Sequence, residues 1–219
     1  KSDTRELPNV ECIAEEYIPF NKEISVIVAR NLKGETSTYP VFEMEFHSEA
    51  NQVEYVICPA RISKSIAEKA TSLAVNVSQK FNHIGLLAVE MFVTNDNDIL
   101  INEVAPRPHN SGHQTIEANY TSQFEQHLRA ILNLPLGSTE NKLCSVMVNL
   151  VGSEGHIGPV VYENIEKILS FDGVTPHIYG KKNTRPFRKM GHVTIINSSI
   201  EKAKTIAKKI KESVKIISK

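Results

Sequence analysis

The sequence lacks long hydrophobic runs and lacks an excess of charge of either sign. Its uninterrupted apolar runs reach only about four residues, against the roughly 20 that span a bilayer, so no membrane-spanning helix is expected. Its 25 lysine and arginine residues balance 25 aspartate and glutamate residues. No overall positive field therefore attracts the chain to nucleic acid or to an anionic membrane surface. With 41% hydrophobic and 23% charged residues over 219 positions, the composition is that of an ordinary folded protein.

Cysteine is also scarce. Cys12, Cys58 and Cys144 are widely separated, and each lies beside apolar, β-forming residues. Because they lack the close spacing of a zinc site or a redox pair, we expect buried, reduced thiols. Residues 1–5 contain no apolar stretch of the kind found in a signal peptide, which predicts a cytoplasmic protein. The missing initiator Met indicates processing, or the back portion of a longer chain.

Regular alternation and helical spacing divide the chain into elements. Four strands are expected to form an antiparallel sheet, at residues 11–17, 23–29, 38–46 and 53–59. Ser63 precedes apolar residues at helical spacing that continue to Gly85, so a helix is expected to pack one face on that sheet. Two further strands, 86–94 and 99–104, flank a turn, and a helix around Phe124 ends before Pro135.

The stretch 134–142 is the best candidate for a boundary, because apolar periodicity lapses there and turn-forming residues cluster. Strands are expected at 145–151, 175–179 and 192–196, and a closing helix from Ile200 to Ile217. The prediction is therefore an α+β fold. An antiparallel sheet with packed helices occupies residues 1–134, and a small α/β domain occupies residues 135–219.

Glu90 and Glu103 lie in the two apolar segments that flank the turn 95–98. If those four residues form the loop, Thr94 pairs with Ile99, and the same count places Glu90 directly opposite Glu103. Two carboxylates about 5 Å apart in buried strands repel each other unless one takes up a proton or both bind a cation. Their oxygen donors favour Mg²⁺ or Mn²⁺. A slip of one residue in register would instead turn one of them toward solvent.

Residues 105–113, Ala-Pro-Arg-Pro-His-Asn-Ser-Gly-His, place polar side chains on a stiff loop. Two prolines restrict the backbone, while Arg107, His109 and Asn110 offer hydrogen-bond donors. Gly112 allows backbone N–H groups to approach an anion at the start of the helix that is expected next. The loop therefore suits recognition of an oxyanion. Alternatively, the prolines simply end a strand and the polar groups are solvated.

Cationic side chains concentrate in a second segment, where five of them occupy nine positions: Lys181, Lys182, Arg185, Arg188 and Lys189. Pro186 and Gly191 keep this segment out of a regular helix. It is expected to be a basic loop that wraps a phosphate. The alternative is a solvated surface segment.

Five sequence motifs occur in an order that resembles a known family. They are Glu-Glu-Tyr-Ile-Pro-Phe at 15–20, Glu-Ile-Ser at 23–25, the run 100–113, Ser-Gln-Phe-Glu at 122–125 and Arg-Lys-Met-Gly-His at 188–192. They resemble 5-(carboxyamino)imidazole ribonucleotide synthase of purine biosynthesis, an ATP-grasp enzyme. The resemblance extends from about residue 10 to residue 196, and Pro-His-Asn-Ser-Gly-His followed by Ser-Gln-Phe-Glu is its most specific part.

The resemblance implies an activity and its partners. Members of the family convert ATP, bicarbonate and 5-aminoimidazole ribonucleotide into the carboxyamino ribonucleotide, ADP and phosphate, through carboxyphosphate, and act as homodimers. It implies that Glu90 and Glu103 hold Mg²⁺ or Mn²⁺ against the ATP phosphates, and that Arg107 and His109 are catalytic residues at the bicarbonate. Residues implied to bind ATP are Glu15, Glu16, Tyr17, Ile18, Glu23, His47, Asn102 and Glu103. Residues implied to bind substrate are Asn110, Ser111, Gly112, His113, Lys181, Arg185, Arg188 and Lys189.

The chain departs from the family pattern in two respects. Phe46 holds the place where the family usually has a histidine after a pair such as Tyr39-Pro40, and His47 follows one residue later. The α/β domain and the lid subdomain that open the family's chain have no counterpart before Glu11, so this chain resembles the back half of the enzyme. Two alternatives stay open: another ATP-grasp purine enzyme, such as the formate-dependent transformylase, and a non-catalytic nucleotide-binding module.

Overall fold

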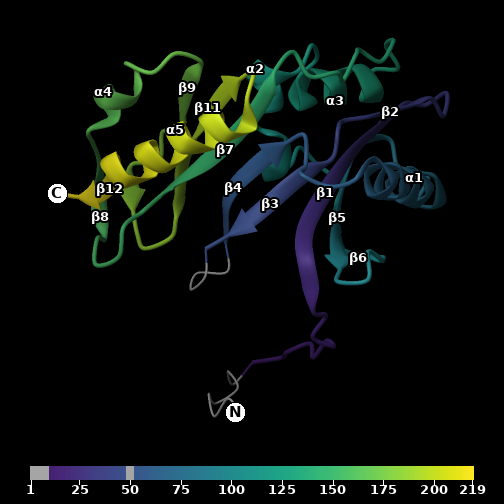
Figure 1. Ribbon diagram of the computed structural model, residues 1–219, viewed down its shortest axis with the longest axis horizontal. Coiled ribbons are helices and arrows are strands. Elements are labelled where there is room, and N and C mark those ends of the chain that lie inside the picture. The colour runs from purple at the N-terminus through teal and green to yellow at the C-terminus, as the bar shows by residue number, and fades with distance from the viewer. Residues whose placement is uncertain (1–9, 48–51) are drawn as a thin grey trace.

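A single sheet of nine strands runs through the computed structural model, which describes residues 10–47 and 52–219 (Figure 1). Its strand order is β6-β5-β1-β3-β4-β7-β11-β9, and β2 pairs with β1. The strands are β1 (Phe20–Arg30), β2 (Thr36–Thr38), β3 (Phe42–Phe46), β4 (Val53–Cys58), β5 (Gly85–Thr94), β6 (Ile99–Ala105), β7 (Cys144–Val151), β9 (Val174–Ile178) and β11 (Lys189–Asn197). Every pairing between them is antiparallel, as expected for residues 1–134, and β7, β9 and β11 from the expected second domain continue the same sheet.

A smaller sheet joins three more strands in the order β10-β8-β12. They are β8 (Gly158–Glu163), β10 (Asn183–Thr184) and β12 (Lys215–Ser218). The segment expected to be a helix up to Ile217 therefore changes conformation: the last helix ends at Ser213, and β12 pairs with β8. Ile216 alternates with exposed Lys215 and is buried in the core, which favours a strand at this point.

Serine caps mark the start of each long helix. In α1 (Lys64–Lys80), α3 (Gln123–Ile131) and α5 (Ile200–Ser213), the side chain of the preceding serine accepts a hydrogen bond from a backbone N–H of the first turn. Three short helices complete the described elements, namely the 3-10 helix η1 (Asn110–Gly112), α2 (Thr115–Ala118) and α4 (Ile165–Ile168). No helix in the described ranges is both long enough and apolar enough to cross a membrane.

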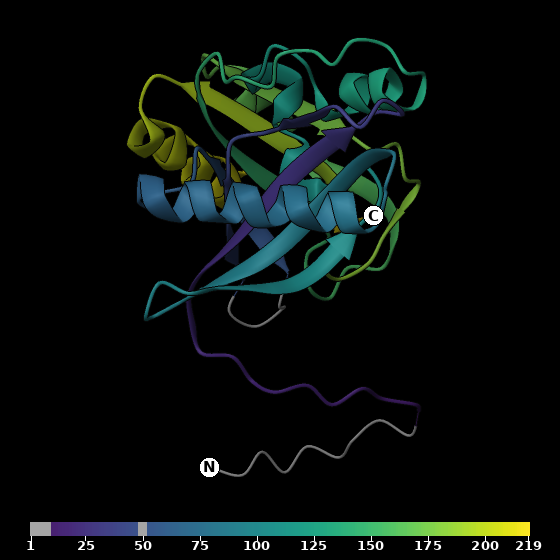
Figure 2. The same ribbon diagram turned by 90° about the vertical axis from the view of Figure 1, so that its right-hand side faces the viewer.

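The two faces of the sheet carry different layers. Ile24, Val26 and Val28 of β1 pack with α1, and the same face continues onto β7 and β11, where α5 covers it. The alternate residues Ile27 and Ala29 face the other side, where α3 contacts β1 and β5. Figure 2 shows α1 lying across the strands. The opposite face, which also bears Ser25, is the one that carries the polar residues described below.

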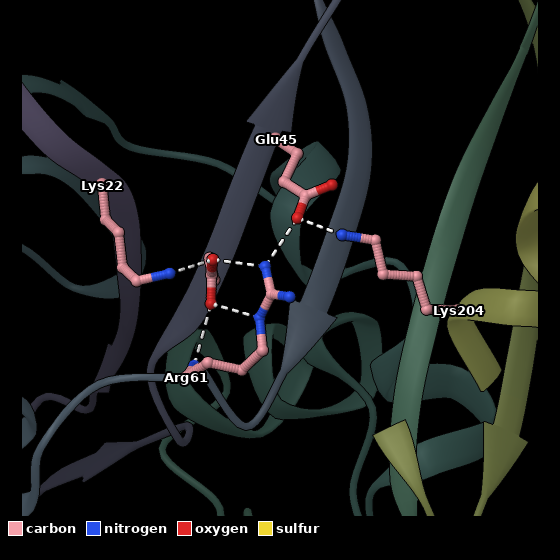
Figure 3. Close-up of polar contacts among 5 residues, drawn as sticks. Lys22, Glu45, Arg61 and Lys204 are labelled. Carbon is pink, nitrogen blue, oxygen red and sulfur yellow. Dashed lines mark hydrogen bonds and ion pairs between the residues drawn. The ribbon is translucent and has the colours of Figure 1, made fainter. Parts of the chain in front are cut away.

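An ion cluster lies between α1 and α5 on their common face (Figure 3). Glu43 is buried, and its carboxylate accepts hydrogen bonds from Lys22 and from the backbone and guanidinium of Arg61. Arg61 also pairs with Glu45, which pairs in turn with Lys204 of α5. Burial opposes ionisation of Glu43, but the hydrogen bonds from Arg61 and Lys22 outweigh it and hold its pKa at about 2.

Three further sequence-based expectations are wrong. Residues 11–17 form no strand and are exposed, because they run away from the sheet below β1 and meet no partner strand among the described residues (Figures 1 and 2). Cys12 is consequently exposed, whereas Cys58 is buried as expected. The segment 38–46 is divided into β2 and β3, which pair with different parts of β1.

The stretch 134–140 has neither helix nor strand. The sheet nevertheless continues across it, because β4 pairs with β7. Residues on both sides of the expected boundary therefore share one sheet, and their division into two domains stays a prediction.

We predict that Arg61→Met lowers the free energy of unfolding by about 1–3 kcal/mol at pH 7, because it removes hydrogen bonds from a buried carboxylate. The folded pKa of Glu43 lies below its ordinary value of 4.5. Its stabilising contribution is therefore present above about pH 4.5 and is lost as the pH falls toward 2. Urea titrations between pH 3 and pH 7 measure the free energy of unfolding. Below about pH 4.5 this free energy should fall less steeply with pH in the variant than in the unmodified chain.

Lys64→Met supplies the control, because Lys64 and Glu68 form an exposed ion pair on α1. Its effect should stay within about 0.5 kcal/mol. Equal effects of the two substitutions would show that the cluster around Glu43 does not stabilise the fold.

Candidate metal and anion site

The strand register gathers three carboxylates on one face of the sheet. Ser25 of β1 lies opposite Glu90 of β5, and Glu90 lies opposite Glu103 of β6. Glu23 is two residues before Ser25 and therefore shares its face. Glu23 and Glu90 are buried, whereas Glu103 is exposed. The expected pairing of Glu90 with Glu103 is confirmed.

The pairing arises by a different route from the one expected. Val93, not Thr94, pairs with Ile99, and a bulge at Asn102 then restores the count, so that Glu90 meets Glu103. The expectation that both strands are buried is wrong for β6. It is the edge strand of the sheet, and most of its residues are exposed.

His109 adds a nitrogen donor to the carboxylate pair. Its Nε2 lies 3.1 Å from Oε1 of Glu90, while Nδ1 accepts the backbone N–H of Ser111 at 3.3 Å. An imidazole that accepts at Nδ1 carries its proton on Nε2, so Nε2 donates to Glu90. Potential ligand atoms of Glu90, Glu103 and His109 all lie within 4.8 Å of one another. The two carboxylates fit a hard dication such as Mg²⁺, with His109 orienting Glu90.

Repulsion among the carboxylates affects Glu23 most clearly. Burial, followed by the charges of Glu90 and Glu103, raises its pKa from 4.5 to about 7. In the absence of a cation, a proton on Glu23 therefore relieves part of the crowding. Repulsion between Glu90 and Glu103 was expected from the sequence, and the structure adds Glu23 as a third carboxylate.

The loop that follows β6 brings its side chains to different places. Asn110 exchanges two hydrogen bonds of 3.0 Å with Asn149 of β7 and accepts one of 3.1 Å from Lys189. Ser111 and Gly112 are buried. The N–H of Gly112 is donated to the carbonyl of His109, and a Cβ at Gly112 would lie 2.5 Å from Ile27. Gly112 thus serves close packing, and its N–H does not face an anion as expected.

Cationic side chains border the carboxylates. Burial lowers the pKa of Lys189, the charge of Glu90 acts to raise it, and the charges of Arg107 and Lys181 lower it further. Arg107 is exposed, and one guanidinium N–H bonds the carbonyl of Pro108. Lys181 donates to the carbonyl of Lys189 at 2.6 Å. This arrangement suits a small oxyanion beside the carboxylates.

Other residues of the basic segment point elsewhere. Arg188 donates to the carbonyl of Asn183 at 2.8 Å, and Arg185 is exposed. As expected, the segment is not helical. Its role in binding a phosphate stays a prediction.

Residues that the resemblance linked to ATP are not gathered at the carboxylates, apart from Glu23, Asn102 and Glu103. Glu15, Glu16, Tyr17 and Ile18 lie on the segment before β1, where the side chain of Tyr17 is 83% exposed. His47 contacts the ring of Phe187 with centroids 6.3 Å apart, at a cavity of about 290 Å³.

A stack of three histidines was not anticipated from the sequence. The ring of His192 lies 4.8 Å from that of His113 and 4.5 Å from that of His177, centroid to centroid. Burial lowers the pKa of His113 to about 4 and of His192 to about 3, so both rings are neutral at pH 7. Tyr179 bonds Nδ1 of His192, and Glu117 bonds Nε2 of His177. His177 of β9 pairs with His192 of β11. Only knowledge of this strand register could have predicted the stack from the sequence.

The antiparallel sheet and its paired carboxylates define a class of protein. A family model described as the ATP-grasp domain matches residues 2–124, more than half of the chain, which belongs to the ATP-grasp family. A second model, described as the phosphoribosylaminoimidazole carboxylase C-terminal domain, matches residues 145–206. Together with the relatives below, these matches confirm the resemblance to 5-(carboxyamino)imidazole ribonucleotide synthase.

Three relatives show how much of the chain is shared. The N5-carboxyaminoimidazole ribonucleotide synthase of Bacillus subtilis is 46% identical over 185 residues, covering 84% of this chain and 47% of its own. A crystal structure of the synthetase from Thermotoga maritima is 48% identical, with a TM-score of 0.86 over 94% of this chain and 55% of its own. The Aspergillus clavatus synthase in complex with ADP and 5-aminoimidazole ribonucleotide is 35% identical, with a TM-score of 0.81 over 90% and 52%. The chain thus spans about half the length of these relatives.

We predict that Glu103→Gln weakens Mn²⁺ binding by this chain about tenfold or more, since a neutral amide does not match the charge of a carboxylate toward a hard dication. Titration followed by the paramagnetic resonance of free Mn²⁺ measures the affinity. Glu68→Gln, an exposed change on α1, is the control and should bind as the unmodified chain does. Unchanged affinity in Glu103→Gln would contradict the assignment of the metal to this pair.

Proposed function

We propose that this chain carries the metal, bicarbonate and ribonucleotide sites of an enzyme that carboxylates 5-aminoimidazole ribonucleotide with ATP. The products are the carboxyamino ribonucleotide, ADP and phosphate. The observation that supports this proposal is the position of Glu90 and Glu103 beside His109 and Lys189. The chain that carries these residues resembles N5-carboxyaminoimidazole ribonucleotide synthases. The unpaired cysteines are consistent with a location in the cytoplasm.

Glu90 and Glu103 are the residues that would hold Mg²⁺. When bound, the ion would offset the charge on the phosphates of ATP. His109 donates to Glu90 and so keeps that carboxylate turned toward Glu103. Asn102 lies at the bulge next to Glu103, on the edge strand of the sheet. A nucleotide bound at the metal would lie beside it.

Arg107 and Lys189 are the groups proposed to receive bicarbonate and the carboxyphosphate formed from it. The guanidinium offers a planar pair of donors to a carboxylate, and the ammonium offers a point charge. Lys189 is fixed from one side by Asn110, which Asn149 holds in turn. Arg107 and Lys189 would hold an oxyanion for attack on the terminal phosphate of ATP, and the metal held by Glu90 and Glu103 would offset the charge there.

The remaining assignments rest on the resemblance. Residues 15–18 and Glu23 are proposed to bind adenosine, and the basic segment around Arg185 and Arg188 the phosphate of the ribonucleotide. The whole enzyme is proposed to be a homodimer. The exposed position of residues 15–17 is consistent with a nucleotide pocket that needs a second wall, from the half of the relatives that this chain does not span.

A chimera tests the proposal directly. We predict that replacing the matching 185 residues of the Bacillus subtilis relative by the corresponding residues of this chain yields ADP formation that depends on both bicarbonate and 5-aminoimidazole ribonucleotide. The 219-residue chain alone should release no ADP above background, because it spans only about half the length of its relatives and phosphoryl transfer depends on full positioning of the phosphates.

The alternatives give different results in the same assay. A requirement for formate in place of bicarbonate would identify a transformylase. A folded chimera that binds nucleotide but does not turn over would favour a non-catalytic module.

We predict that Arg107→Lys in this chimera raises the KM for bicarbonate about tenfold or more and changes the KM for ATP less than twofold. An ammonium lacks the planar fork, and losing one charged hydrogen bond costs about 1.5–3 kcal/mol. Lys33→Arg is the control, because it changes a cation on an exposed turn. Equal increases in both KM values would show that Arg107 supports the fold rather than the anion.

A further inference from the structure

Gln123 holds the backbone of His109 with both ends of its amide. Its Oε1 accepts the N–H of His109 at 2.8 Å, and its Nε2 donates to the carbonyl of His109 at 2.8 Å. Gln123 is completely buried, at the first position of α3. Its own N–H is donated to the hydroxyl of Thr115 at 2.9 Å, which fixes where the side chain begins. The amide of Gln123 thus makes with the backbone of His109 the two hydrogen bonds that a residue of a neighbouring β-strand would make.

The second N–H of the same amide is directed at another histidine. Nε2 of Gln123 lies 3.1 Å from Nδ1 of His113. An amide nitrogen only donates, so Nδ1 accepts and the proton of this neutral ring is on Nε2. The ring is held between Phe124 and His192, with centroids 5.8 Å and 4.8 Å away. Within the described ranges, no hydrogen-bond partner occupies Nε2 of His113.

We propose that Gln123 is a positioning residue: it sets His109 against Glu90 and keeps His113 in the tautomer that presents an Nε2–H donor beside Lys189. The inference rests on the proposed function, in which an oxyanion lies near these groups. Both N–H donors and the oxygen of the amide are used, so no other natural side chain of this size reproduces the three hydrogen bonds. Glutamate keeps the acceptor for His109 and loses both donors, and methionine loses all three.

Gln126 provides a matched control on the same helix. It is completely buried, and it clamps a backbone in the same manner, donating to the carbonyl of Gly137 and accepting the N–H of Gly137, both at 2.9 Å. Gly137 lies outside the carboxylate site. Gln126→Met therefore removes one clamp of the same kind and depth without touching a histidine.

The test compares Gln123→Met, Gln123→Glu and Gln126→Met in the 219-residue chain. Nitrogen-15 NMR of the imidazole rings reports the tautomer of His113, and Mn²⁺ titration reports the carboxylate pair. We expect the Nε2–H tautomer of His113 in the unmodified chain and in Gln126→Met. Both Gln123 variants should show mixed tautomers and bind Mn²⁺ about 3- to 10-fold more weakly.

Two results would overturn the proposal. One is an unchanged tautomer and an unchanged Mn²⁺ affinity in a folded Gln123 variant. The other is an equal loss of Mn²⁺ affinity and of the Nε2–H tautomer in Gln126→Met. That result would show that Gln123 only stabilises the fold. Neither readout requires ribonucleotide carboxylation, so an inactive chimera would count against the proposed function and leave the positioning role standing.

Discussion

Repulsion among three carboxylates on one sheet face is the constraint on which the site depends. Strand register alone brings Glu23, Glu90 and Glu103 together. Within residues 10–47 and 52–219, none of the three forms a salt bridge with an arginine or lysine of the kind that neutralises Glu43 on the opposite face. The same protein thus treats two clusters of carboxylates in opposite ways. One set is neutralised internally and stabilises the fold. The other is left with an excess of negative charge that a dication would relieve, which is the usual separation between structural and functional charge.

Uncharged side chains hold the residues that surround these carboxylates. Asparagine and glutamine amides, rather than ion pairs, connect the loop after β6 to α3 and β7. Amides supply donors and acceptors together, so they hold His109 and Lys189 in place without adding net charge beside the carboxylates.

Sequence patterns predicted the elements that depend on local periodicity. The helix after Ser63 and the hairpin that pairs Glu90 with Glu103 follow from spacing and turn chemistry. Other features depend on contacts that no local pattern contains. The change from helix to strand after Ser213 and the histidine stack both require the position of a distant strand. The bulge at Asn102 lies within the hairpin itself, and the expected pairing of Thr94 with Ile99 missed it. The motif containing Gln123 was recognised as specific, but its reason, a clamp on His109, needed coordinates.

The contact between Glu45 and Lys204 joins residues that are 159 positions apart, and it has a consequence during synthesis. At the usual 5–20 residues per second, a ribosome needs roughly 8 to 32 seconds to cover that distance. Throughout this time the face of β3 and β4 that α5 will cover is exposed, and the edge of β4 stays unpaired until β7 (Cys144–Val151) has been made. The sheet therefore closes late in synthesis, because strands that are neighbours in space are made far apart in time.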